Sequence, residues 1–169
     1  MIIRAEHPDD ERELAALIDA AFEDTETSVF TAEIRASSGY VPELTFVADD
    51  DGELVGFTML SYVTAGERDV LVLTPMAVRP DRQRAGVGKQ VVRAAIAAAD
   101  ARGEPVLLVE GVPSYYPQFG FSSASELGFE RPDPRIPEAA WMALPLTTWN
   151  PEVAAPVVYP GFFPPPPNA

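Results

Sequence analysis

The sequence predicts a mixed α/β domain, and three observations carry this prediction. The chain has 169 residues, the size of one domain with a real hydrophobic core. Apolar runs of strand length alternate with segments in which apolar residues recur at helical spacing. Two apolar runs are joined by a turn ending in Asp51-Gly52, a strong signal for an antiparallel hairpin. The expected strands cover residues 2–4, 44–48, 54–63, 70–78, 106–109 and 140–146, and the expected helices residues 8–22, 28–37 and 89–102.

The two helices expected before the hairpin have a recognisable start and inner faces. Asp10 and Glu13 have the spacing of a capping box at the start of the first helix. His7, the only histidine, precedes the helix in a turn, and we expect it to be an exposed loop residue and not a base. The residues expected to face inward are Leu14, Leu17, Ile18, Ala21 and Phe22 in the first helix, and Val29, Phe30 and Ile34 in the second.

The hairpin turn carries three consecutive aspartates at residues 49–51. A solvated turn is the expected reading of this cluster. A calcium site is the alternative, but the twelve-residue pattern of calcium-binding loops is missing. We expect no metal elsewhere either, and the absence of cysteine excludes a thiolate metal site.

A glycine-rich turn follows the apolar run at residues 70–78 and precedes the helix expected at residues 89–102. The first N–H groups of a helix have no partner inside it, and the helix dipole favours an anion there. Gly86 and Gly88 would let the backbone approach such a ligand closely. Pro75 removes one ladder N–H from the preceding strand, which predicts a bulge or a split. A phosphate site is therefore expected at this turn, and a tight turn without a ligand is the alternative.

The pattern of the turn narrows the class of ligand. A P-loop is excluded because Gly-Lys-Ser/Thr is absent, and a dinucleotide fingerprint lacks its third glycine, since Val91 stands there. The remaining pattern, Gln83-x-x-Gly86-x-Gly88, resembles the Gln/Arg-x-x-Gly-x-Gly/Ala signature of the GNAT superfamily of acyl-CoA-dependent N-acyltransferases. A second element of that family, Tyr-x-x-x-Gly-Phe, is matched at Tyr116, Gly120 and Phe121.

The resemblance implies a fold and a domain range. We expect a GNAT-type mixed, mostly antiparallel central sheet with a splayed central strand and flanking helices. The N-acetyltransferase domain should cover residues 1–146, followed by a proline-rich tail at residues 147–169. Eleven of the eighteen prolines lie from Pro132 to Pro167. A docked tail, buried through Tyr159, Phe162 and Phe163, is favoured over a proline-rich ligand for another protein.

The resemblance also assigns the expected site. Acetyl-CoA is the implied cosubstrate, with its pyrophosphate on the turn and its pantetheine arm added to the strand before it. The cofactor-binding residues implied are Met76, Ala77 and Val78 on the strand and Arg84, Ala85, Gly86, Val87, Gly88 and Lys89 on the turn. Tyr116 matches the general acid that protonates the leaving thiolate, and core packing is the alternative for it. The general base is not apparent, and Glu110 and Glu26 are candidates by position only.

Charge and composition bound the partners. The formal net charge is −14, which argues against a nucleic-acid partner. Five of the twelve basic residues, including the only lysine, lie within residues 79–93, where they would offset a polyanionic cofactor; an ordinary solvated helix start is the alternative. The acidity elsewhere favours a small cationic amine or a basic peptide end as acceptor, drawn in over about 8 Å at physiological salt. The chain has neither a signal peptide nor a membrane-length apolar run, so a cytoplasmic protein without a membrane partner is expected, with a homodimer left open.

The function expected from these features is transfer of an acetyl group from acetyl-CoA to a primary amine by direct attack in a ternary complex. Two other classes stay open. One is a non-catalytic acyl-CoA-binding or sensor module of the same fold. The other is a Rossmann-like nucleotide enzyme, which the missing third glycine and the antiparallel hairpin disfavour.

Overall fold

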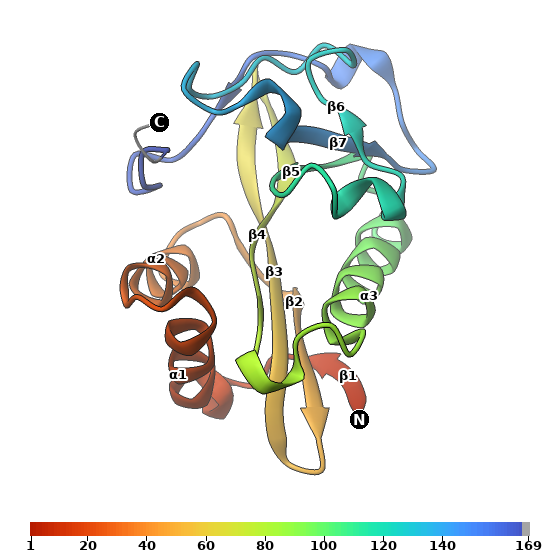
Figure 1. The fold of residues 1–169 in the computed structure, drawn as a ribbon. Coiled ribbons are helices and arrows are strands. Elements are labelled where there is room, and N and C mark those ends of the chain that lie inside the picture. The colour runs from red at the N-terminus through yellow and green to blue at the C-terminus, as the bar shows by residue number, and fades with distance from the viewer. Residues whose placement is uncertain (167–169) are drawn as a thin grey trace. The chain divides into compact units, whose positions relative to one another are not determined.

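The computed structural model describes residues 1–166, so Pro167 of the predicted proline run and the two residues after it lie outside the described part (Figure 1). The chain divides into two compact units. Residues 1–61 and 74–98 form unit 1, and residues 62–73 with those described from 99 onward form unit 2. Two long strands, β3 (Glu53–Ala65) and β4 (Arg68–Val78), contribute residues to both units. Within residues 1–166, no helix combines the length and the apolar character needed to cross a bilayer.

The strands form a mixed, mostly antiparallel sheet in the order β1-β2-β3-β4-β5-β7-β6, and β8 pairs with β3. β4 and β5 run parallel in the register Leu71↔Leu107 to Leu73↔Val109. This confirms the predicted fold class. The remaining strands are β1 (Ile2–Ala5), β2 (Tyr40–Asp50), β5 (Val106–Glu110), β6 (Ser122–Ser123), β7 (Trp141–Pro145) and β8 (Val157–Val158). The two strands that the sequence did not predict, β6 and β8, are two residues long, too short to show any periodicity.

Unit 1 contains α1 (Glu11–Phe22) and α2 (Glu26–Arg35), which lie side by side, and most of α3 (Val87–Ala101) (Figure 1). The predicted inner faces are confirmed at their centres, where Leu14, Leu17, Ile18, Phe30 and Ile34 are buried. Two predictions at the margins are wrong, because Phe22 is 42% exposed and Val29 is 58% exposed. In α2 the buried stripe runs through Phe30, Thr31 and Ile34, and Val29 lies on its flank.

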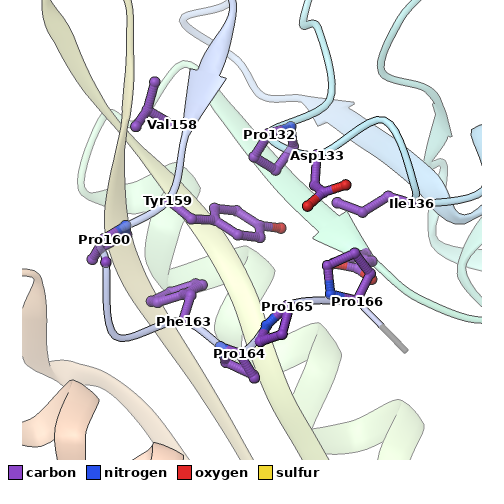
Figure 2. A pocket seen from close by; sticks show the side chains of 12 residues that line it. Pro132, Asp133, Ile136, Val158, Tyr159, Pro160, Phe163, Pro164, Pro165 and Pro166 are labelled. Atoms are coloured by element: carbon purple, nitrogen blue, oxygen red, sulfur yellow. The ribbon is translucent and has the colours of Figure 1, made fainter. Parts of the chain in front are cut away.

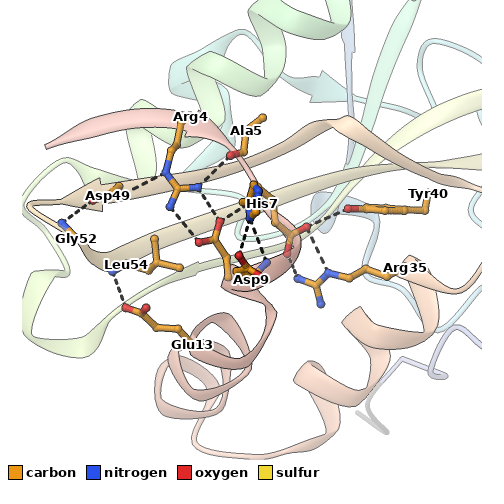
Figure 3. A network of polar contacts seen from close by, with 12 residues as sticks. Arg4, Ala5, His7, Asp9, Glu13, Arg35, Tyr40, Asp49, Gly52 and Leu54 are labelled. Atoms are coloured by element: carbon orange, nitrogen blue, oxygen red, sulfur yellow. Dashed lines mark hydrogen bonds and ion pairs between the residues drawn. The ribbon is translucent and has the colours of Figure 1, made fainter.

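A polar network joins β1, α1 and β2 in unit 1 (Figure 3). The Arg4 guanidinium pairs with the carboxylate of Asp10 at 2.7 Å and with that of Asp49 at 3.1 Å. The hydrogen bonds from Arg4 are the main reason that the pKa of Asp10 lies below its usual value. The network thereby fixes the start of α1 against the edge of the hairpin.

The helix cap belongs to this network and differs from the prediction. A short 3₁₀ turn at Pro8–Asp10 precedes α1, so the capping box is formed one turn earlier, between His7 and Asp10. The Asp10 carboxylate accepts from the His7 N–H at 2.8 Å, and the His7 ring accepts from the Asp9 N–H. The predicted box of Asp10 and Glu13 is wrong, because the Glu13 carboxylate instead accepts from the Leu54 N–H at 2.8 Å.

The core of unit 2 is built around Trp141, whose indole N–H donates to the carbonyl of Phe129 at 2.9 Å. Apolar residues of β3, β4, β5 and β7 surround it. The segment after β7 packs on the same core, with Val153 and Val157 buried and Tyr159 and Phe163 partly buried against it. The buried members of this core are Val63, Ala65, Val70, Val72, Val106, Leu108, Ala124, Phe129, Ile136, Trp141, Ala143, Val153 and Val157.

Candidate functional site

In unit 1 the site begins at the end of β4. The pairing of β4 with β5 stops at Leu73, two residues before Pro75, and the peptide bond between Thr74 and Pro75 is cis. Among the strands described in residues 1–166, none pairs with residues 74–78 on the edge away from β3. The sequence predicted this interruption from Pro75. It leaves backbone groups on one edge of a strand free to bind an extended ligand.

Two hydrogen bonds show which backbone groups face this open edge. The Arg79 N–H donates to the carbonyl of Val55 on β3 at 3.0 Å, and the Pro75 carbonyl accepts from the Thr58 hydroxyl of β3 at 3.4 Å. Since backbone groups alternate between the two edges along a strand, residues 75, 77 and 79 turn toward β3. The N–H and C=O groups of Met76 and Val78 therefore face the open edge, where the Val78 carbonyl already accepts from the side-chain amide of Gln83 at 3.2 Å.

The turn after β4 is shaped by two residues in left-handed conformation, Arg84 at φ 61° and Gly86 at φ 85°. α3 begins at Val87, two residues earlier than predicted. Its first bond to the turn runs from the Gln90 N–H to the carbonyl of Gly86 at 3.3 Å. Within the described part of the chain, the N–H groups of residues 84–89 donate to no backbone or side-chain oxygen. These consecutive free N–H groups are what an anion-binding turn offers.

The positive charges around the turn are of two kinds. Arg79 pairs with Asp81 and Glu53, and Arg82 pairs with Asp50, so the charges of both arginines are offset by acidic residues of the chain. Arg84, Lys89 and Arg93 are exposed and form no ion pair with any residue in the described range 1–166. Five basic residues lie near the turn in the sequence. Of these five, Arg84, Lys89 and Arg93 have no ion-pair partner in residues 1–166 and could pair with a ligand.

The start of α3 is held close to the sheet of unit 1. Val87 and Val91 are buried against Ala48 and Val55, with Met76 and Val78 partly buried at the margin. Gly56 on β3 permits this approach, because a Cβ added there would lie 2.5 Å from Cγ1 of Val87. The predicted strand residues and the predicted turn residues are thus brought together in one unit.

The candidate general acid, Tyr116, belongs to unit 2. It is the first residue of a 3₁₀ turn that ends at Phe119. The side chain is 6% exposed, and its ring packs edge-on against those of Tyr115 and Phe121. A Cβ added to Gly111 would lie only 2.2 Å from Cε2 of Tyr116, so the backbone at Gly111 rests directly on the ring. The phenol is therefore rigidly held.

The Tyr116 hydroxyl is available for chemistry. It forms no hydrogen bond with residues 1–166. Since it is also not fully buried, the hydroxyl oxygen reaches solvent. Burial, and to a smaller degree the neighbouring Tyr115, raises the pKa of this hydroxyl above that of a free phenol. The phenol therefore keeps its proton throughout the neutral range.

The candidates for a general base are not equivalent in the structure. Glu26 is the exposed first residue of α2, and the exposed His7 serves in the capping box. Glu110 ends β5, and burial of its carboxylate, followed by the charge of Asp133, raises its pKa. The residue as a whole remains exposed, so this rise reflects a carboxylate that faces a pocket and is not sealed from water.

That pocket was not predicted. It has a volume of about 290 Å³ and is bounded by Glu110, by the loop around Asp133 and by the final described segment around Tyr159 (Figure 2). These three parts lie far apart in the sequence, and none carries a motif. The Asp133 and Tyr159 side chains point into the same space.

The order of the strands, with one parallel pair in a mostly antiparallel sheet and a glycine turn after β4, defines the class of fold. The chain belongs to the acetyltransferase (GNAT) family, whose model matches residues 11–121. The resemblance drawn from the two motifs is confirmed.

Relatives with curated names agree with this assignment. The chain is 36% identical over 114 residues to the uncharacterized N-acetyltransferase YjhQ of Escherichia coli K12, across 63% of this chain and 62% of that protein. It is 36% identical over 73 residues to a mycothiol acetyltransferase of Actinosynnema mirum, across 43% of this chain and 24% of that protein. The chain thus spans less than two thirds of the length of these relatives.

Solved structures share the fold over nearly the whole chain. The GNAT family N-acetyltransferase YhbS of Escherichia coli, in complex with CoA, has a TM-score of 0.87 and 25% identity, with 95% of this chain and 90% of that chain covered. A GNAT family acetyltransferase of Brucella melitensis, in complex with acetyl-CoA, has a TM-score of 0.79 and 24% identity, with 96% and 97% covered. The second likeness concerns the fold alone.

Proposed function

We propose that this protein is an N-acetyltransferase that moves an acetyl group from acetyl-CoA to a primary amine by direct attack in a ternary complex. The observation that carries the proposal is the turn at residues 84–89, with its free N–H groups and unpaired cations, in a chain of the GNAT family. YhbS, similar over 95% of this chain, was solved with CoA bound.

The residues of unit 1 would hold the cofactor. The N–H groups of Arg84, Ala85, Gly86, Val87, Gly88 and Lys89 would receive the pyrophosphate oxygens, assisted by the Arg84 and Lys89 side chains. The pantetheine arm would pair with the open edge of β4 through the N–H and C=O of Met76 and the N–H of Val78, since the Val78 carbonyl is bound by Gln83. Ala77 belongs to the same stretch, but its backbone groups turn toward β3, so its contribution would be to keep that edge straight.

The chemistry requires a neutral amine and a protonated leaving group. The amine nitrogen attacks the thioester carbonyl, the C–N bond forms, and the C–S bond breaks as the tetrahedral intermediate collapses. Tyr116 would donate its proton to the departing sulfur and regain one from the nitrogen or from solvent. The products are the N-acetylated amine and CoA, and one further proton from the original ammonium is released.

The pKa order makes this proton transfer demanding. A free thiol has a pKa of about 8.5 and a free phenol one of about 10. Burial raises the pKa of Tyr116 further, so its proton would be given only to a thiolate that is itself poorly solvated. A site that excludes water around the sulfur satisfies this condition.

A non-catalytic acyl-CoA-binding module is the second candidate. The two candidates differ in what they require of Tyr116. A binding module needs only its ring, whereas the hydroxyl is kept free of hydrogen bonds to residues 1–166. This observation favours turnover.

Acetyl-CoA binding is the first test. A ligand present at 100 times its Kd adds about 2.7 kcal/mol of stability, so saturating acetyl-CoA should raise Tm by several degrees, whereas NAD should not. Arg84→Glu and Lys89→Glu should each raise Kd about tenfold or more, as expected when a charge-assisted contact of about 1.5–3 kcal/mol is lost.

Arg12→Glu is the matched control, since Arg12 is an exposed arginine of α1 in the same unit and the charge change is identical. Its Kd for acetyl-CoA should stay at the wild-type value. The cofactor assignment is refuted if no CoA ester shifts Tm, or if all three variants weaken binding equally.

A further inference from the structure

The pocket of unit 2 has the size of a small-molecule site. Its volume of about 290 Å³ lies just below the range of about 300–1,000 Å³ that such sites occupy. Glu110 contributes from the end of β5, and Asp133 and Ile136 contribute from the loop before β7. The segment from Val158 to Pro166 supplies the remaining wall (Figure 2).

The charged residues that line this pocket are of one sign. Its lining residues include two carboxylates and no lysine, arginine or histidine. Asp133 is ionised at any ordinary pH, because hydrogen bonds from Arg135 lower its pKa to about 2, and its carboxylate is paired with the Arg135 guanidinium at 2.6 Å. Glu110 forms no ion pair with any residue from 1 to 166; burial and, to a smaller degree, the charge of Asp133 raise its pKa, and a hydrogen bond from the Tyr159 hydroxyl opposes this rise. Glu110 is therefore the lining carboxylate that has no cationic partner in the described part of the chain, and a cation inside the pocket would stabilise its ionised form.

The rest of the lining is apolar and aromatic. The Tyr159 ring contacts the rings of Phe163, at 4.6 Å between centroids, and Trp141, at 6.3 Å. Burial and the neighbouring Glu110 raise the pKa of the Tyr159 hydroxyl, so the ring stays neutral. A neutral aromatic ring attracts cations over its face. Ile136 and the prolines of the final segment complete a surface suited to a hydrocarbon body.

The pocket adjoins the proposed acid along the chain. Glu110 is followed directly by Gly111, the residue whose backbone rests on the ring of Tyr116. Glu110 and Tyr116 therefore both belong to unit 2, and the contact of Gly111 with the Tyr116 ring connects them.

We infer that this pocket binds the ammonium group of the amine acceptor, with Glu110 as its counter-ion, and that it selects small primary amines without a carboxylate. The inference rests on the proposed acetyl transfer, because only that reaction makes the bound amine an acceptor. Binding of the amine to the pocket does not depend on the reaction. An amino acid would bring a carboxylate next to Glu110, in a pocket whose described lining residues include no cation. A simple alkylamine or arylalkylamine carries only the charge that the pocket can pair.

The test compares 2-phenylethylamine with L-phenylalanine, which differ by the α-carboxylate alone. Binding to the free enzyme is measured by titration calorimetry without acetyl-CoA, and kcat/KM is measured with it. The wild-type protein should prefer 2-phenylethylamine at least about tenfold in both measurements. Glu110→Gln keeps the size of the side chain and should weaken binding of the amine about tenfold or more, with the loss appearing mainly in KM.

Glu126→Gln is the matched control, because Glu126 is an exposed carboxylate of the same unit that does not line the pocket. It should leave both measurements unchanged. Equal binding of the amine by wild type and a folded Glu110→Gln, or a preference for phenylalanine, overturns the inference. Loss of amine binding in Glu110→Gln without acetyl transfer by the wild type supports the pocket and refutes the proposed function. Normal transfer with an unaffected Glu110→Gln does the reverse.

Discussion

Gly111→Ala tests whether the position of the Tyr116 ring matters for catalysis. The added Cβ would lie 2.2 Å from Cε2 of Tyr116, whereas ordinary contacts begin at 3.4 Å, so the ring or the backbone must move by 3.4 − 2.2 = 1.2 Å. A misplacement of about 1 Å in a catalytic group can cost about 100-fold in rate, or about 2.7 kcal/mol of activation free energy. Overpacking of this kind also destabilises a protein by about 1–3 kcal/mol.

The assay is a double-mutant cycle on kcat at saturating acetyl-CoA and amine, with urea unfolding to confirm that each variant is folded. Tyr116→Phe removes only a hydroxyl that has no hydrogen-bond partner in residues 1–166, so it should fold normally. Its kcat should fall by about 10²–10⁴, the usual contribution of a general acid. In the Tyr116→Phe background, Gly111→Ala should lower kcat by no more than about threefold, because groups that act as a unit are not additive.

An unchanged kcat in a folded Gly111→Ala would show that the reaction does not depend on where the ring lies. A full additional loss in the double variant would show that Gly111 acts by another route. A near-normal kcat in Tyr116→Phe would assign Tyr116 to core packing. Any of these results removes the proposed role of the phenol.

Two further predictions concern unit 1. Gly56→Ala should destabilise the protein by about 1–3 kcal/mol and weaken acetyl-CoA binding, because the added Cβ would lie 2.5 Å from Cγ1 of Val87 at the start of α3. Adding Val87→Ala should relieve most of this loss. Strict additivity of the two changes in the free energy of unfolding would contradict the mechanism. Asp10 has a pKa lowered chiefly by Arg4, so its stabilising contribution is present above the unfolded pKa of about 3.9 and is lost as pH falls through the lower folded value. Asp10→Asn should therefore reduce the free energy of unfolding at pH 6 and flatten its decline below about pH 4, whereas an unaltered acid profile would assign that decline to other carboxylates.

Most elements of the fold could be predicted because they depend on neighbours in the sequence. The hairpin follows from Asp51-Gly52, which adopt φ 55° and φ 91° in the structure. The interruption of the pairing along β4 follows from Pro75. The position of α3 follows from the glycine turn and from the helical spacing of apolar residues after it. Relations of two to four residues are enough to specify each of these.

The errors arose where distant parts of the chain compete for the same group. Glu13 has the spacing of a capping partner, but its carboxylate binds the N–H of Leu54, 41 residues away. Arg82 belongs to the basic cluster in the sequence, but Asp50 of the hairpin neutralises it from a distance of 32 residues. Local spacing cannot reveal which of several possible partners packing will supply.

The sequence by itself determined the family, through two short motifs in the right order, and with it the elements that make up the cofactor turn. The tertiary structure alone decided which N–H groups and which cations of that turn remain free, and that Gly111 holds Tyr116. It also assembled the pocket of Glu110, Asp133 and Tyr159, which no motif marks. The reason is physical: backbone conformation follows from local sterics and periodicity, whereas charge pairing, burial and pocket shape follow from contacts between segments that only folding brings together.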